Sequence, residues 1–418
     1  MKKEPSNSPR INWKSGTWEG PAGIGDAIEV IIAGDWAPIR DFSGPAADTP
    51  LALYGNLLPL LRECHLRIVN LECPLVDGGK PINKSGSVLK GASHHITGLT
   101  EVPFDVVTLG NNHAFDYGEE AFSATLKLLD KNVILRAGAG LSKIEAEKPL
   151  LIKTNGIHIG VISFCEGEDL TAASEDRPGV FGWDVDRVVD LVRDIRPDVH
   201  VIIVICHGGV EYIPSPPLYL ARALRRVADA GADLIIGHHP HVPQGVEIHS
   251  GAPICYSLGN FVFYQPTDLL YRKIGYLIKA SATQEGLKSI RIIPYEIGAG
   301  GLTLLEGEKL RRTLRKLEVI SAPLPGEDGI NDAWRGFLKY YGVNGFKKEI
   351  SSIMDKFEHE LPKGAAMFRN RLTTMQHYHH LKDLMTQIVD GTIDSAPQWA
   401  VESVADYFTR RIEDGLPE

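Results

Sequence analysis

Five short motifs combine histidine, asparagine and carboxylate side chains, and each directly follows an apolar segment. They occupy residues 34–35, 70–72, 111–118, 207–212 and 237–244. Carboxylates and imidazoles are suitable ligands for Mn, Fe, Zn or Co, and the lack of any Cys-x-x-Cys pair in the sequence argues against a structural zinc site. Ligands in open α/β sheets gather outside the carboxyl ends of the strands. The positions of the motifs therefore predict one shared, metal-dependent active site.

Each motif taken alone also has an ordinary structural interpretation. A Gly-Asp pair after a strand is typical of a turn, and residues 70–72 could cap a helix. His239 and His241 are stronger, because alternate residues of an extended segment point to the same side. Asp116 lies three residues after His113 and can orient that imidazole and raise its basicity. The coincidence of five motifs at strand ends favours a common site.

The elements that must position these motifs alternate between two patterns up to about residue 265. Near-continuously apolar segments, as expected of strands buried on both faces, occupy 28–33, 66–70, 105–109, 132–136, 158–164, 199–205, 233–236 and 254–258. Helical patterns occupy 51–64, 118–130, 184–196 and 217–230. This alternation predicts an α/β sheet covered by helices.

The rest of the chain has a different character. Two β-rich runs within residues 274–296 flank a Glu285-Gly286 turn and predict a hairpin, and after residue 305 the pattern is helical. The expected domains are an N-terminal arm (1–26), a main domain (27–300) and a helical C-terminal extension (301–418). We expect the extension to cover the site or to drive homo-oligomerisation. Its His-Tyr-His-His tract at 377–380 has no carboxylate cluster beside it and is interpreted as a solvated or interfacial helix face.

Composition narrows the class of protein. The 418 residues include 44 Lys and Arg against 53 Asp and Glu, and the net charge of -9 argues against nucleic acid as a partner. No apolar run approaches the roughly 18 residues that would span a bilayer, and no apolar segment follows the charged start. The five scattered cysteines favour reduced, buried thiols. We therefore expect a cytoplasmic protein without a membrane anchor.

Together with residues 256–261, the motifs resemble the CapA family of bacterial capsule synthesis, or poly-γ-glutamate biosynthesis, proteins. The resemblance extends over roughly residues 27–265 in the right order. It implies a calcineurin-like metallophosphoesterase fold, that is, an α/β, four-layer αββα sandwich of two mixed sheets flanked by helices. It also implies a role around γ-linked polyglutamate or a related polymer.

The resemblance further implies roles for individual residues. The candidate ligands for one or two divalent ions (Mn, Fe or Zn) are Asp35, Glu72, Asn112, His207, His239 and His241. His113 becomes the candidate general acid, and Asp116 its orienting partner. Apart from the resemblance, we name Arg40, Glu211, Tyr212, Gln244 and Asn260 as substrate-binding candidates: the guanidinium of Arg40 could pair with a substrate carboxylate or phosphate, and Glu211 could bind an ammonium group or support a ligand.

Three features depart from the related proteins. Ala37 stands where the phosphoesterases have a ligand histidine, and Glu72 follows Asn70-Leu71 where their bridging Asp follows a glycine. One metal position is therefore weakened, and a mononuclear site is an alternative to a dinuclear one. CapA-type capsule proteins often carry an N-terminal anchor, whose absence here favours another cytoplasmic pathway.

Three functions fit these features. The preferred one is a metal-dependent hydrolase that acts on an anionic small molecule or polymer, with a γ-glutamyl amide or a phosphoester as the bond cleaved. The second is a non-catalytic accessory protein that binds polyglutamate during capsule synthesis. The third is a metallophosphodiesterase or nucleotidase, which the missing histidine at position 37 disfavours.

Overall fold

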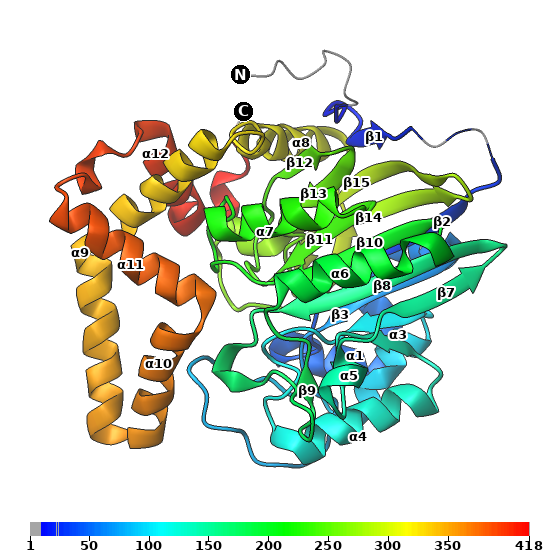
Figure 1. Cartoon of the computed structure of the whole chain (residues 1–418), viewed down its shortest axis with the longest axis horizontal. Coiled ribbons are helices and arrows are strands. Elements are labelled where there is room, and N and C mark those ends of the chain that lie inside the picture. Colours follow the sequence, from blue (N-terminus) through cyan, green and yellow to red (C-terminus); the bar gives the residue numbers. More distant parts are fainter. Residues whose placement is uncertain (1–9, 22, 24, 418) are drawn as a thin grey trace.

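Two stacked β-sheets form the centre of the computed structural model, which describes residues 10–21, 23 and 25–417 (Figure 1). The first sheet has the order β1 (Thr17–Glu19), β15 (Gly286–Gly298), β14 (Ile274–Thr283), β2 (Ile28–Trp36), β3 (Leu66–Leu71), β4 (Val106–Thr108) and β5 (Leu135–Ala137), with β16 (Gly301–Leu304) beside β15. The second has the order β12 (Val246–His249), β13 (Ala252–Cys255), β11 (Leu234–His238), β10 (Val201–His207), β8 (Ile157–Cys165) and β7 (Leu150–Thr154). A separate pair joins β6 (Ala139–Gly140) to β9 (Gly179–Val180).

Both sheets are mixed: the second has a parallel centre and antiparallel edges, whereas the first is antiparallel on the β1 side and parallel through to its other edge at β5. Strands β2, β3, β4 and β5 run parallel, as do β8, β10, β11 and β13 in the other sheet. The hairpin of β14 and β15 pairs with β2 in antiparallel fashion. Because parallel strands end at the same edge, the polar motifs that follow them are brought to one edge of the molecule.

Buried apolar side chains define the four layers. One cluster lies between the sheets and includes Ile32 and Ile68 of the first and Ile203 and Ile236 of the second. The outer face of the first sheet packs against α4 (Gly118–Lys131). On the outer face of the second lie α6 (Val185–Ile195) and α7 (Leu218–Asp229). The predicted αββα sandwich is therefore confirmed.

One predicted helix, 51–64, is mostly not α-helical. Residues Pro50–Leu57 form a 3₁₀ segment, and only Leu58–Glu63 form an α-helix, α2. Gly55 adopts a positive φ of 48°, and a Cβ there would collide with the Leu302 carbonyl oxygen. The backbone must therefore break its helical course at this close approach. The shorter helices are α1 (Ser43–Asp48), α3 (Thr97–Thr100) and α5 (Lys143–Ala146).

The two expected domain boundaries fall inside the first sheet. In the expected N-terminal arm, Thr17–Glu19 pair with β15, whereas residues 1–9, 22 and 24 lie outside the described residues. At the other end, Gly301–Leu304 still pair with β15. The first sheet therefore includes one short strand from each side of the expected main domain, β1 and β16.

The C-terminal extension is helical, as expected after residue 305. It contains α8 (Gly307–Ser321), α9 (Glu327–His359), α10 (Leu361–Thr373), α11 (Met375–Val389) and α12 (Gln398–Thr409). Helix α8 lies against β12 and β15, whereas α9 to α12 form a group beside the sheets, on the left of Figure 1. Helix α9 is interrupted at Gly342, where φ is 54°. Among the helices that the structure describes, none combines the length and apolarity needed to cross a membrane.

Candidate functional site

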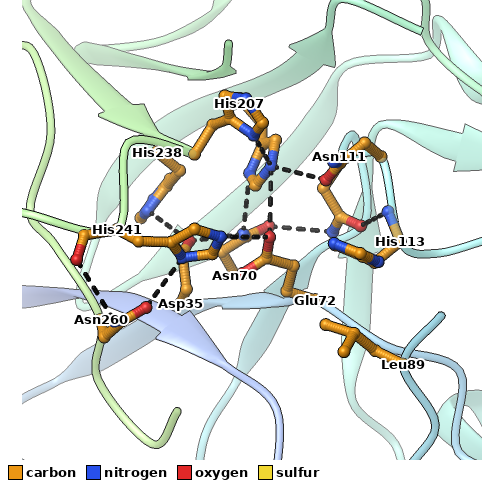
Figure 2. A network of polar contacts seen from close by, with 12 residues as sticks. Asp35, Asn70, Glu72, Leu89, Asn111, His113, His207, His238, His241 and Asn260 are labelled. Atoms are coloured by element: carbon orange, nitrogen blue, oxygen red, sulfur yellow. Dashed lines mark hydrogen bonds and ion pairs between the residues drawn. The ribbon is translucent and has the colours of Figure 1, made fainter. Parts of the chain in front are cut away.

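The carboxyl ends of four parallel strands deliver polar side chains to a common point. Asp35 lies near the end of β2, beside Asn70 of β3, and Glu72 directly follows β3. In the other sheet, His207 ends β10 beside His238, which ends β11. Figure 2 shows these side chains converging from the two sheets. The strand-end arrangement predicted from the motifs is therefore present.

The first group of donor atoms consists of Asp35, Glu72 and His241. Their ligand atoms all lie within 4.8 Å of one another, and all three residues are buried. Asp35 Oδ2 and both carboxylate oxygens of Glu72 have no hydrogen-bond partner among the described residues. Buried carboxylate oxygens without partners are costly, and an ion would compensate them. The group therefore fits a divalent cation.

The second group shares Glu72 and is centred on Nε2 of His207. That nitrogen lies 2.9 Å from Asn112 Oδ1, 3.3 Å from His239 Nδ1 and 3.4 Å from Glu72 Oε1. The other ring nitrogen, Nδ1, is 3.2 Å from Asn70 Nδ2, which also donates to Asp35. All six predicted ligand candidates are thus brought together in two adjoining groups.

The histidine missing at position 37 has no replacement there, but His238 approaches the same carboxylate from β11. Ala37 is buried, and its N–H donates to the Val262 carbonyl at 2.7 Å. His238 Nδ1 lies 3.1 Å from Asp35 Oδ1. His238 is not among the ligands predicted from the sequence, although its position at the end of a buried strand is a signal for it.

Two of the candidate ligands have strained backbones. His239 has a φ of 99° and His241 a φ of 57°, values that residues other than glycine rarely adopt. Such conformations cost about 1–3 kcal/mol each and persist where the surrounding structure requires them. The two strained residues flank Pro240: His241 points into the site in Figure 2, and His239 reaches it with Nδ1 3.3 Å from His207 Nε2.

The charges of the first group depend strongly on one another. Burial and the nearby Asp35 raise the pKa of Glu72 well above its usual value. Burial alone would lower the pKa of His241, but Glu72 and Asp35 raise it to about 10. Burial raises the pKa of Asp35, yet the imidazoles of His238 and His241, 3.1 Å and 3.5 Å from its two oxygens, bring it well below the usual value. In the metal-free site the protonated His241 supplies the positive charge that faces Asp35 and Glu72, and a bound cation would supply that charge instead.

His113 and Asp116 form a dyad beside the second group. His113 Nδ1 lies 2.6 Å from Asp116 Oδ2, as the three-residue spacing predicts. Asn111 fixes this turn, because its side-chain oxygen accepts the backbone N–H groups of His113 and Ala114. With Nδ1 engaged by the carboxylate, Nε2 is the ring nitrogen left for proton transfer.

A buried lysine, which no sequence motif indicated, contacts both members of the His113–Asp116 dyad. Lys84 Nζ donates to Asp116 Oδ1 at 2.7 Å and to the Asn112 carbonyl at 2.9 Å, and it lies 3.3 Å from His113 Nδ1. Burial and this lysine lower the pKa of His113. Burial raises the pKa of Asp116, but His113 and Lys84 lower it, so the net shift is downward. The neutral imidazole and the ionised carboxylate are therefore favoured.

The predicted substrate-binding residues separate into internal and accessible groups. Gln244 is buried and donates to the Ile213 carbonyl at 2.9 Å. Asn260 lies 2.8 Å from His241 Nδ1 and leaves Nε2 of that ring facing Glu72. The Asn260 side chain and the Gln244 amide nitrogen thus contact protein groups, whereas Gln244 Oε1 has no hydrogen-bond partner among the described residues, and a role of either amide in substrate binding stays a prediction.

The other three candidates are at least partly accessible. Arg40 is exposed, and its guanidinium donates to the Tyr264 carbonyl at 3.2 Å. The Tyr212 ring stacks on His241 with centroids 6.0 Å apart. Burial raises the pKa of Glu211, but nearby His241 lowers it, so this carboxylate carries its charge close to the centre.

The C-terminal extension reaches the centre through the first turn of α11. The Gln376 backbone N–H donates to Glu166 Oε2 at 3.1 Å, and its Oε1 lies 3.5 Å from His239 Nε2. Its side-chain amide also donates to Glu168, which is itself 3.6 Å from His239. Helix α11 therefore contacts one of the candidate ligands, and both roles expected for the extension stay predictions. These residues lie far from the motifs in sequence, and no local pattern pointed to them.

Comparison with known proteins gives matches over the part of the chain that contains the site. The family described as "Bacterial capsule synthesis protein PGA_cap" matches residues 29–265, more than half of the chain. The PGA biosynthesis protein CapA of Bacillus subtilis is 36% identical over 170 residues, which cover 40% of this chain and 44% of that protein. The capsule biosynthesis protein CapA of Bacillus anthracis is 26% identical over 276 residues, which cover 63% of this chain and 67% of that protein.

Solved structures include distant likenesses. The chain is 14% identical to a putative 5'-nucleotidase from Staphylococcus aureus, with a TM-score of 0.42 and coverage of 69% of this chain and 58% of that one. It is also 14% identical to the Haemophilus influenzae NAD nucleotidase, with a TM-score of 0.41 and coverage of 70% and 63%.

Proposed function

The chain belongs to the PGA_cap family of bacterial capsule synthesis proteins, and we propose that it is a metal-dependent hydrolase. Its substrate would be an anionic γ-glutamyl amide or phosphoester in a capsule or poly-γ-glutamate pathway. The observation that carries the proposal is the set of buried carboxylate oxygens of Asp35 and Glu72 that lack partners among the described residues and face His241.

The donor atoms suit a divalent transition metal. Asp35, Glu72 and His241 would hold one ion, and Glu72, Asn112, His207 and His239 a second. Mixed oxygen and imidazole donors without thiolates favour Mn, Fe or Zn. When bound, such an ion polarises the bond to be cleaved and lowers the pKa of water.

The protein groups around the centre supply proton transfer and orientation. His113 would exchange a proton with the reacting groups through Nε2, while Asp116 fixes its tautomer and ring plane. Lys84 holds the other oxygen of Asp116, so the carboxylate cannot turn away from the imidazole. Glu211 would face a positively charged part of the substrate.

The test combines metal analysis with a hydrolysis panel of γ-glutamyl peptides and phosphodiesters. We expect divalent metal in the purified protein, its loss in a His239→Ala, His241→Ala double variant, and hydrolysis that His113→Ala reduces by about 100-fold or more. His249→Ala is the matched control, because this half-buried histidine pairs with Asp229 away from the centre. A protein that neither binds Mn, Fe or Zn nor is stabilised by them would contradict the proposal.

A non-catalytic role is the second candidate. A Mycobacterium tuberculosis relative, 28% identical over 227 residues that cover 50% of this chain and 59% of that protein, is named "Probable polyglutamine synthesis accessory protein". An accessory role would leave pathway function intact in His113→Ala and abolish it when α9 to α12 are disrupted. The hydrolase proposal predicts that polymer production or processing depends on His113.

A further inference from the structure

A cavity of about 340 Å³ lies between the candidate centre and the helical extension. Glu211 and Tyr212 line it from the main domain, and helices α9, α10 and α11 contribute side chains from the other side. Two further lining residues, Glu168 and Gln376, both contact His239. The volume is in the range of small-molecule sites, and the position is next to the candidate metal ligands.

Two polar side chains of the extension line this cavity with unsatisfied atoms. Asn370 Oδ1 and His380 Nε2 have no hydrogen-bond partner among the described residues, although Asn370 is 1% exposed and His380 is 6% exposed. The His380 ring lies among aromatic rings, 4.3 Å from that of Tyr341 and 4.9 Å from that of Phe337. A phenylalanine at position 380 would suit such neighbours better, because an unsatisfied buried polar atom lowers stability. Polar groups retained at this cost indicate a ligand that satisfies them.

Charged groups of both signs line the same cavity. Arg371 is held by Glu349, and its Nη1 lies 3.3 Å from His377 Nε2. Glu211 and Glu168 lie on the side of the main domain. Arg371 is already paired with Glu349, but a ligand that carries both N–H groups and a carboxylate offers partners to Asn370 Oδ1 and the main-domain carboxylates as well as to His380 Nε2 and the Arg371 guanidinium.

We propose that this cavity binds an amino-acid-type zwitterion, with its carboxylate at Arg371 and His380 and its N–H groups at Asn370 and Glu211. The helical extension is then the substrate-recognition element of the centre. This assignment rests on the proposed function for the identity of the reacting bond. The binding itself follows from the cavity.

Calorimetric titration of the full-length protein tests the assignment, with γ-L-glutamyl-L-glutamate as the probe. Glutarate, which has carboxylates and no N–H group, is the comparison ligand. His380→Phe removes the unsatisfied nitrogen and should bind the dipeptide at least about tenfold more weakly while unfolding at an equal or higher temperature. His379→Phe is the matched control, because residue 379 stacks on Tyr219 outside the cavity and a phenyl ring preserves this contact. It should bind as the unmodified protein does.

Three results would overturn the assignment: no binding of the dipeptide at millimolar concentration, equal binding of glutarate, or unchanged binding by His380→Phe. If His380→Phe does not fold, Asn370→Leu serves as the second variant, with the same weakened binding expected and unchanged binding contradicting it. A protein that binds the dipeptide but cleaves nothing contradicts the proposed function alone. Hydrolysis that does not depend on residues 370 and 380 contradicts this assignment alone.

Discussion

Uptake of a divalent metal ion should release protons, because His241 is protonated in the metal-free protein at neutral pH. The ring is buried between Glu72 and Asp35, and these two carboxyl groups raise its pKa to about 10 although burial alone would lower it. Metal ligands must be deprotonated, so the ion competes with this proton for the imidazole.

The size of the effect follows from the difference between the pKa and the solution pH. At about pH 7 the proton of His241 must be removed some three units below its pKa, which costs about 4 kcal/mol and weakens apparent metal affinity about 1,000-fold. Apparent affinity should therefore rise about tenfold per pH unit for each proton released. The charge of Glu72 is what raises the pKa of His241, so the buried pair holds one proton between its two members and total release should be about one proton per ion.

Folding of the metal-free protein gives an independent check of the sign. A histidine whose pKa is raised above its unfolded value of 6.5 stabilises the fold below that value, and this stability is lost as the pH rises towards about 10. Without metal, the free energy of unfolding should fall between about pH 7 and pH 9, whereas with metal bound this fall should disappear.

The assay is calorimetric titration with Mn²⁺ in buffers of different ionisation enthalpy, because the slope of heat against that enthalpy counts the protons. His241→Asn should reduce the count by about one, since asparagine carries no proton to release. His249→Asn, a histidine paired with Asp229 outside the centre, should keep the original count. A count of zero in the unmodified protein, or an unchanged count in His241→Asn, would refute the reasoning.

Three further changes have defined outcomes. Asp116→Asn should lower kcat about 100-fold or more and leave the metal content unchanged, because the carboxylate orients His113 and contacts none of the candidate ligand atoms. Loss of metal in this variant would show that the role of Asp116 is structural. Gly237→Ala should lower the free energy of unfolding by about 1–3 kcal/mol in denaturant titration, since a Cβ there collides with the Tyr256 carbonyl, and an unchanged midpoint would contradict that contact. Burial raises the pKa of Asp406, but hydrogen bonds from a lysine and a tyrosine lower it below 3.8. Asp406→Asn should therefore lower the free energy of unfolding by about 2 kcal/mol at neutral pH, and this difference should shrink as the pH falls below 3.8. A difference that does not depend on pH would exclude the ion pair as its cause.

The centre could be predicted because its residues are tied to strands with a strong local signal. Strands β2, β3, β10 and β11 are apolar along nearly their whole length, and their parallel pairing places their ends together. A polar residue at the carboxyl end of such a strand must therefore lie at the shared edge of the sheets. The dyad was equally predictable, because His113 and Asp116 are close in sequence and their contact is local.

The remaining parts depend on contacts between distant segments. Lys84 lies in a stretch without regular secondary structure and meets Asp116 32 residues later, and Gln376 meets Glu166 across 210 residues. No periodicity encodes such pairs. The same reason explains Gly55, whose break in the helix follows from a carbonyl of Leu302.

The most direct test of the central claim is anomalous diffraction from crystals of the full-length protein loaded with Mn²⁺. The account predicts a peak within coordination distance of Asp35, Glu72 and His241, with a second beside His207 and His239 if the centre is dinuclear. Loaded crystals with no peak at the first position, or with manganese bound only away from these side chains, would contradict it.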